Sequence, residues 1–532
     1  MRHSRRGLRP AAACCCVIVA STLVLNAQAD RPPFRVFEAS IDDVQTALRS
    51  HQISCHDLVG QYLTRIDAFN RRGPSINAVE TINPHALDDA DRLDRVEATA
   101  GRGPLHCVPI LVKDELDTGG LETTYGSAAF KGFFPSADAT VIARLKAAGA
   151  IIIGKATMGE FASGYATSVS GVIRDPYDLT RHASGSSGGT GAGIAANLAT
   201  VGIGEDTGGS VRGPAATGSL VGLRPSLPFV SRAGLLPARP TTDTVGPIAR
   251  TVKDAAIIMD VIAGYDPRDP VTAEAPTLVP GTFVSRLNAQ SLRGARLGVI
   301  RQSQDARTDS QSAEFVAFHR VGDVALQRLQ TLGAVTVELA EIPNLAKRLD
   351  QDYDGNVFET EQAVDRFLAA ETRPPFNTLR EVLLSGLMLP ARAATLIDSV
   401  NRTTADVGYH RIRQDVRDLT EHLLGVIKQQ RLDAVVYLTA DIPPIHLEPD
   451  VMTNPRAGGT RLGSNRRLAS VLSFPAITVP AGFTPEGLPV GLEFLGVPFS
   501  DATLLSLAYA FESGTHHRRP PASTPALEFI SR

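Results

Sequence analysis

The chain has 532 residues, of which 43% are hydrophobic, 5% aromatic and 20% charged, and its formal net charge at pH 7 is −3. This composition is typical of a globular protein with a large buried core, and it excludes a disordered or fibrous chain. The mildly acidic balance contains no block of like charge, so no nucleic-acid partner is expected.

The first 29 residues have the three-part pattern of an export signal. Residues 1–10 carry four arginines and no acid, residues 11–25 are uncharged, and Ala27 and Ala29 are the small residues that a signal peptidase recognises. The uncharged run is shorter than the ~20 residues that span a bilayer, which disfavours a permanent anchor. We therefore predict a signal peptide over residues 1–29 and a periplasmic or secreted mature chain without a membrane span. The choice between general and twin-arginine export stays open.

Three of the five cysteines fall within this signal, which leaves Cys55 and Cys107 in the mature chain. In an oxidising compartment these two permit one disulfide, and two unpaired buried thiols are the alternative. The histidines form no His-Glu-x-x-His pattern and no cluster with cysteine, so neither a metal nor another cofactor is expected.

Short helices and short apolar strands alternate along the mature chain. The expected helices start at Ser40 and Ser54 or cover residues 140–148, 190–198, 251–263 and 313–332. The expected strands cover residues 108–112, 151–153, 200–203, 297–300, 335–339, 434–438, 476–479 and 490–494. This alternation predicts an α/β fold with a mixed, twisted central β-sheet, mostly parallel at its core and flanked by helices.

We expect one large domain over residues 30–532. No internal repeat divides it. The stretch from about residue 343 to 430 is more polar and more helical than the rest, and we interpret it as a variable region on the substrate side.

A segment rich in Gly, Ser and Thr runs from Ser184 to Ser219. A flexible linker is disfavoured because an apolar helix and strand lie between its two Gly-Ser clusters. A phosphate-binding loop is disfavoured because the segment lacks Gly-Lys-Ser/Thr and has no Gly-x-Gly-x-x-Gly after a strand. Residues 185–189 match Gly-x-Ser-x-Gly, the nucleophile elbow of α/β-hydrolases centred on Ser187, but the polar stretch before them does not predict the strand that an elbow requires.

Two serines and a lysine give a better explanation. Ser186 and Ser210 stand 24 residues apart in separate Gly-rich loops, and Lys113 ends a predicted buried strand. A lysine in such a place is often a salt-bridged structural residue. Burial without full compensation, however, lowers the pKa of a lysine and makes it a usable general base.

The residues before the second serine favour an oxyanion hole. Thr207, Gly208 and Gly209 precede Ser210, and successive glycines allow backbone N–H groups to converge on one point without obstruction by side chains.

The sequence resembles the amidase signature hydrolases over nearly all of the mature chain. The matching motifs are Gly103–Asp114, Gly185–Gly189, Asp206–Ala215, Gly222–Ser226, Asp243–Arg250, Phe474–Phe483 and Gly487–Leu492, with the core motifs between residues 103 and 250. Cys107 replaces the glycine that is usual in the family. Thr207 stands where isoleucine is common, but only its backbone is needed.

The resemblance implies a Ser–cis-Ser–Lys triad of Ser210, Ser186 and Lys113, with a cis peptide bond between Gly185 and Ser186. Neutral Lys113 accepts a proton from Ser186, which accepts one from the nucleophile Ser210, and water then hydrolyses the acyl-enzyme through the reverse relay.

Three further residues match the motifs around this triad. Asp206, Arg212 and Ser187 are expected to hold the catalytic loops in place.

The expected activity is hydrolysis of a carboxamide C–N bond, giving an acid and an amine or ammonia, with a small-molecule or peptide-derived amide as substrate. One alternative is the glutaminase subunit of an amidotransferase, which the export signal disfavours. Another is an exported, catalytically silent binding protein, which the complete set of triad residues disfavours. The sequence leaves open whether the amide is fatty, aryl, peptide or carbamate, and it leaves the oligomeric state open.

Overall fold

The computed structural model describes residues 34–96, 102–275, 281–353 and 356–528. The predicted signal peptide over residues 1–29 lies outside these ranges, so export stays a prediction. None of the helices within them combines the length and hydropathy that a membrane span requires.

Within the described residues, eleven strands form one continuous sheet in the order β1-β3-β2-β6-β8-β7-β12-β13-β11-β9-β10. The strands are β1 (Val79–Ile82), β2 (Pro109–Lys113), β3 (Ile151–Ala156), β6 (Val201–Glu205), β7 (Val221–Arg224), β8 (Val245–Ala249), β9 (Arg296–Val299), β10 (Val335–Glu338), β11 (Ala434–Leu438), β12 (Ala476–Phe483) and β13 (Pro489–Leu495). A separate ribbon pairs β4 (Ala166–Thr167) with β5 (Gly171–Val172). The single large sheet agrees with the predicted single domain.

The sheet is mixed, as predicted, but its core is not mostly parallel. β2 runs parallel to β3 and β6, and β9 runs parallel to β10 and β11. The remaining pairings are antiparallel. The prediction missed the antiparallel strands β1, β7 and β8. In β7 and β8, Gly222, Gly246 and Pro247 interrupt the apolar pattern by which a strand is recognised.

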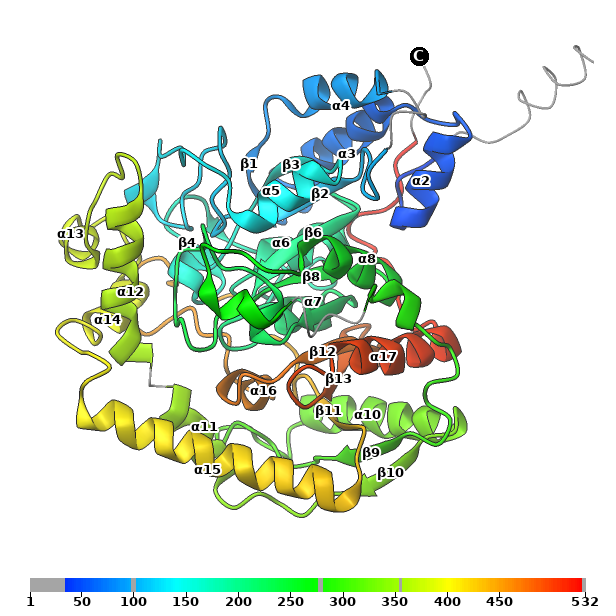
Figure 1. Cartoon of the computed structure of the whole chain (residues 1–532), viewed down its shortest axis with the longest axis vertical. Helices are drawn as coiled ribbons and strands as arrows, with labels where there is room; N and C mark the ends of the chain where they lie inside the picture. The colour runs from blue at the N-terminus through cyan, green and yellow to red at the C-terminus, as the bar shows by residue number, and fades with distance from the viewer. Residues whose placement is uncertain (1–33, 97–101, 276–280, 354–355, 529–532) are drawn as a thin grey trace, which may run out of the picture.

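The helices of the described ranges pack on this sheet or, as with the group between residues 356 and 397, stand at one side of it (Figure 1). They are α2 (Ile41–Arg49), α3 (Cys55–Phe69), α4 (Ala86–Asp94), α5 (Thr140–Ala147), α6 (Gly188–Ala195), α7 (Arg212–Thr217), α8 (Val252–Ile262), α10 (Ala313–Thr331), α11 (Leu345–Tyr353), α12 (Asn356–Ala370), α13 (Leu379–Leu384), α14 (Pro390–Ile397), α15 (Val407–Gln430), α16 (Arg467–Val471) and α17 (Asp501–Thr515). The region around residues 343–430 is helical, as predicted.

Side-chain caps fix several helix starts as the sequence predicts. Ser40 and Asp43 form a reciprocal capping box at α2, and Thr251 caps α8 by accepting the N–H of Asp254. α6 differs from the prediction, because it begins at Gly188 rather than at residue 190. The Gly-Ser loop therefore leads directly into the first turn of α6.

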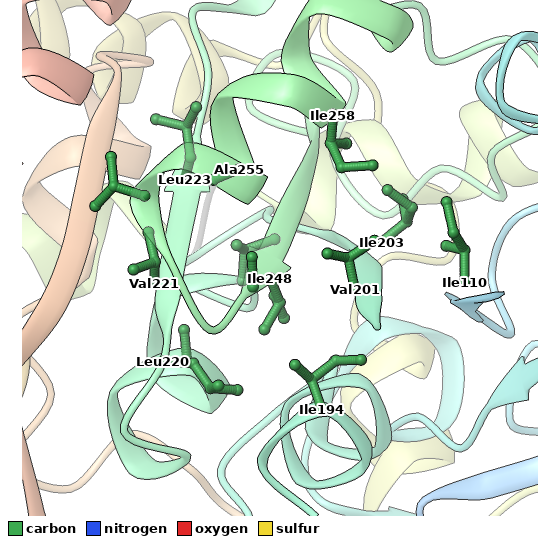
Figure 2. Close-up of a cluster of buried hydrophobic side chains, with 14 of the residues drawn as sticks. Ile110, Ile194, Val201, Ile203, Leu220, Val221, Leu223, Ile248, Ala255 and Ile258 are labelled. Carbon is green, nitrogen blue, oxygen red and sulfur yellow. The ribbon is translucent and has the colours of Figure 1, made fainter. Parts of the chain in front are cut away.

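One cluster of buried hydrophobic side chains lies between α6 and α8, with strands of the sheet between them (Figure 2). Ile194 of α6 and Ile258 of α8 approach β6 and its neighbours from opposite sides, and both are fully buried. Burial of such a side chain contributes about 1.5–3 kcal/mol. The loops that leave β2 and β6 therefore start from a tightly packed frame.

The structure pairs Cys55 and Cys107 in a disulfide, with their Cα atoms 5.5 Å apart. Cys55 begins α3, and Cys107 lies two residues before β2. This selects the disulfide over the two free thiols that the sequence also allowed. The bond ties a surface helix to the strand that carries Lys113.

Candidate active site

Lys113 is the last residue of β2, and its side chain is fully buried. Its Nζ donates hydrogen bonds to Ser186 Oγ at 2.9 Å and to Glu205 Oε2 at 2.8 Å. Glu115 Oε2 lies 2.7 Å from the same nitrogen. Because β2 and β6 are adjacent parallel strands, their carboxyl ends bring Lys113 and Glu205 together.

The sequence predicts that burial lowers the pKa of Lys113, and the structure corrects this. Burial does disfavour the charged amine, but Glu115 and Glu205 together outweigh it and raise the pKa of Lys113. The sequence analysis missed both acids. Glu205 is separated from Lys113 by 92 residues, and no motif points to the contact.

The loop before α6 supplies Ser186. The Gly185–Ser186 peptide bond is cis, as predicted from the family resemblance. Ser186 Oγ accepts the hydrogen bond from Lys113, and Ser186 also lines a cavity of about 480 Å³, part of which is open solvent.

Ser210 lies on the wall of the same cavity as Ser186. The structure shows no hydrogen bond between the two hydroxyls among the residues that it describes. Catalytic hydrogen bonds are often long in an empty site and tighten when substrate binds. The three predicted triad residues are thus gathered at one place, with the contact between Lys113 and Ser186 formed.

Ala162–Gly164 line another part of this cavity, and the segment Gly458–Arg467 supplies much of the rest. The helices of the predicted substrate-side region stand behind the first of these walls: Val364 and Leu368 of α12 pack in one apolar cluster with Phe161.

The loop between β6 and Ser210 is held by Asp206. Its carboxylate accepts hydrogen bonds from the backbone N–H groups of Gly209 at 2.9 Å and Val211 at 3.1 Å, on either side of the serine. The N–H of Gly209 is therefore already engaged, which removes it from the predicted oxyanion hole and leaves Thr207 and Gly208 of that set. Gly208 lines the cavity.

Asp206 is in turn neutralised by two buried arginines. Arg212 Nη2 lies 3.1 Å and Arg224 Nη1 lies 3.0 Å from Asp206 Oδ1. Although burial opposes ionisation, the two arginines lower the pKa of Asp206 below its ordinary range. Asp206 and Arg212 thus have the loop-holding contacts that the sequence predicts.

Ser187 also has a structural contact. Its Oγ donates to the backbone carbonyl of Glu205 at 3.1 Å and is fully buried, so it links the Gly-Ser loop to the end of β6. A nucleophile elbow centred on Ser187 would expose this hydroxyl to the cavity, and the structure contradicts that arrangement.

Arg466 is a site residue that the sequence analysis missed. Its Nη1 donates to the carbonyl of Gly209 at 3.0 Å and to the carbonyl of Gly185 at 3.4 Å. These glycines directly precede Ser210 and Ser186, so one guanidinium nitrogen joins both serine loops. We call this contact the Arg466 clamp. A side chain on Gly209 would collide with Arg466.

The side chains of Cys55, His106 and Cys107 are the described group that lies close enough together to hold a metal ion. The structure instead joins the two cysteines in the disulfide.

A sequence model of the family described as Amidase matches residues 57–505. The chain belongs to the Amidase family. It is therefore an amide-hydrolysing enzyme of the amidase signature fold, as the sequence predicts.

Relatives of this amidase cover nearly its whole length. A probable amidase from Arabidopsis thaliana is 30% identical, over 92% of each chain. A glutamyl-tRNA(Gln) amidotransferase subunit from Symbiobacterium thermophilum is 34% identical, over 89% of this chain and 96% of its own. The crystal structure of a peptide amidase from Stenotrophomonas maltophilia matches with a TM-score of 0.82 and 33% identity, over 92% of this chain and 99% of its own.

Proposed function

We propose that this amidase cleaves a carboxamide through an acyl-enzyme on Ser210, with Ser186 and Lys113 as its proton relay. The observation that carries the proposal is the hydrogen bond from buried Lys113 to Ser186, on the wall of the cavity that also contains Ser210. Ser186 is thus placed between the buried amine, which it contacts, and the cavity that it lines together with Ser210.

The reaction starts from neutral Lys113. Ser210 Oγ attacks the amide carbonyl while its proton passes to Ser186 Oγ, and the proton of Ser186 passes to Lys113 Nζ. The relay then returns a proton to the leaving amine as the C–N bond breaks. Water attacks the ester on Ser210 by the same relay and releases the acid.

The negative charge that develops on the carbonyl oxygen of the substrate must be stabilised by hydrogen-bond donors that already point toward it. In the proposal these are the backbone N–H groups of Thr207 and Gly208. Asp206 holds the loop that carries them, since it fixes the backbone on both sides of Ser210.

We propose the amide of a peptide or N-acylated amino acid as the substrate class. The similarity to a peptide amidase supports this. A second cavity, of about 530 Å³ including open solvent, also supports it, because it shares Thr460 and Arg466 with the first. Apolar side chains, including Phe318 and Ile442, line the second cavity and suit an apolar substituent next to the scissile bond.

Glutamine hydrolysis for an amidotransferase is the second candidate, because a component of one such enzyme is 34% identical to this chain. The two functions separate on substrates. A peptide-type amidase releases ammonia from N-acyl-leucine amide faster than from glutamine and needs no partner. A glutaminase subunit releases ammonia faster from glutamine and needs its partner subunits.

The decisive experiment is active-site labelling with a fluorophosphonate. Ser210→Ala is expected to abolish both labelling and amide hydrolysis, and mass mapping of the wild type should place the label on Ser210. Ser187→Ala is the matched control and keeps a labelled Ser210. A label on Ser187, or full activity without Ser210, would contradict the proposal.

We also propose that the mature amidase is exported, which the pattern over residues 1–29 supports. Fractionation and N-terminal sequencing of the expressed protein test this. The expected product begins near residue 30 and lies outside the cytoplasm, and a full-length cytoplasmic product would contradict export.

A further inference from the structure

Lys113 contacts two acids, Glu115 and Glu205, that take no part in the proposed proton relay. A base must be neutral to accept a proton from Ser186, yet Glu205 and Glu115 contact the other side of its amine. All of these side chains are buried, where water screens their charges little. The two acids must therefore affect when Lys113 becomes a base.

The two acids differ in their surroundings. Both oxygens of Glu205 are engaged, Oε2 by Lys113 and Oε1 by the hydroxyl of Thr207 at 2.6 Å. Glu115 contacts Lys113 through Oε2, which lies 2.7 Å from Nζ, and its Oε1 has no hydrogen-bond partner within the described part of the chain. Burying an ionised carboxylate with an unsatisfied oxygen is costly, so the environment of Glu115 disfavours its charged form.

The titration of Glu115 agrees with this assignment. Burial, followed by the charge of Glu205, raises the pKa of Glu115 well above its ordinary range. When Glu115 is protonated its charge no longer favours protonated Lys113, and Glu205 is then the acid that remains hydrogen-bonded to Nζ.

Other charged groups face this pair. They are Asp243 before β8, Asp206 and Arg212 on either side of Ser210, Arg224 in β7, and the pair of Asp114 and Lys155. The two arginines bind Asp206, and Asp114 Oδ1 lies 3.7 Å from Lys155. Burial and the charge of Glu205 raise the pKa of Asp243 to about 7, so Asp243 is the remaining acid that must be controlled in any pH experiment.

We propose that Glu205 is the counter-ion that keeps Lys113 protonated and thereby sets the pH below which the proton relay is off. The inference rests on the proposed function. Glu205 acts through Lys113 and is a positioning residue. An opposite charge at this range moves a pKa by about one to three units, so the rate is expected to rise toward alkaline pH.

The test is the pH dependence of kcat/KM of the whole mature enzyme, followed from about pH 6 up to about pH 11.5, because the raised pKa of Lys113 places its limb in the alkaline range. Glu205→Gln is expected to move the acidic limb to lower pH by about one to three units, since Lys113 loses its counter-charge. Glu115→Gln and Asp243→Asn are expected to move it by much less. An unmoved limb in Glu205→Gln, or a larger shift in Glu115→Gln, overturns the proposal.

Asp254→Asn is the matched control for the removal of a buried acid. Asp254 is buried at the start of α8, where it accepts the N–H of Ile41, and burial raises its pKa to about 6. Its replacement affects stability but leaves the acidic limb in place. A limb that moves equally in this variant overturns the specific role of Glu205.

A second variant and a second readout keep the test decisive if Glu205→Gln does not fold. Glu205→Asp retains the charge but withdraws it by one methylene, so a smaller shift in the same direction is expected, and no shift overturns the proposal. The rate of fluorophosphonate labelling over the same pH range reports the relay without substrate. Failure of the proposed function looks different, because hydrolysis would then survive Ser210→Ala at every pH.

Discussion

The carboxylate of Asp206 accepts a hydrogen bond from the backbone N–H of Gly209 at a distance of 2.9 Å. The same carboxylate binds the N–H of Val211, so a single buried side chain holds both neighbours of Ser210. The position of the nucleophile therefore depends on a carboxylate that itself depends on two arginines.

Removing Asp206 should damage both stability and catalysis. Asp206→Ala leaves Arg212 and Arg224 buried without their partner, and breaking a buried pair in this way costs about 3–5 kcal/mol. We expect a lower midpoint of thermal unfolding, together with a fall in kcat that exceeds the change in KM. Asp501→Asn removes a buried acid that binds Ser226 and should affect unfolding alone. Equal kinetic effects in the two variants would contradict the role of Asp206.

The Arg466 clamp predicts that a substitution of Arg466 changes kcat more than KM. Lysine keeps the charge of Arg466 but lacks the planar fork that reaches the carbonyls of both Gly185 and Gly209. Arg466→Lys should lower kcat by about tenfold or more, equivalent to about 1.4 kcal/mol, with a smaller change in KM. Arg301→Lys, at an exposed ion pair, is the control and should leave kcat unchanged. A normal kcat in Arg466→Lys would show that the two serine loops keep their positions without the Arg466 clamp.

The disulfide should matter for stability rather than for chemistry. The double variant Cys55→Ser, Cys107→Ser is expected to lose about 2–5 kcal/mol of unfolding free energy in urea. Its kcat at low temperature should stay near that of the wild type, because neither cysteine lines the cavity around Ser210. Dithiothreitol should lower the stability of the wild type to a similar extent and leave the variant unchanged. Equal sensitivity of both proteins to the reductant would contradict the pairing.

Asp175 predicts a loss of stability at higher pH. Burial raises its pKa to about 8, and its Oδ2 has no hydrogen-bond partner among the described residues. An acid whose pKa rises on folding stabilises the protein below its ordinary pKa of about 4, and that contribution is lost as the pH rises through about 8. The wild type should thus unfold more easily at about pH 8 than at about pH 5. Asp175→Asn should reduce the difference, and an unchanged difference would exclude Asp175 as its source.

The parts of the site that the sequence predicts are those determined by local backbone. Ser186 and Ser210 stand in short Gly-rich motifs and Lys113 ends a continuous apolar strand, so local sequence together with the family resemblance is enough to find them. Glu205 and Arg466 act through contacts that span 92 residues to Lys113 and 257 residues to Gly209. These contacts depend on which strands are neighbours, and the sequence pattern did not determine the strand order. The pKa of Lys113 was wrongly predicted for the same reason.

Arg466 lies near the end of a chain whose three relay residues are all synthesised much earlier. A growing chain that has passed residue 210 contains every group of the proton relay but lacks the guanidinium that joins the two serine loops. The site therefore reaches the geometry described here only after the C-terminal part of the chain has folded against those loops.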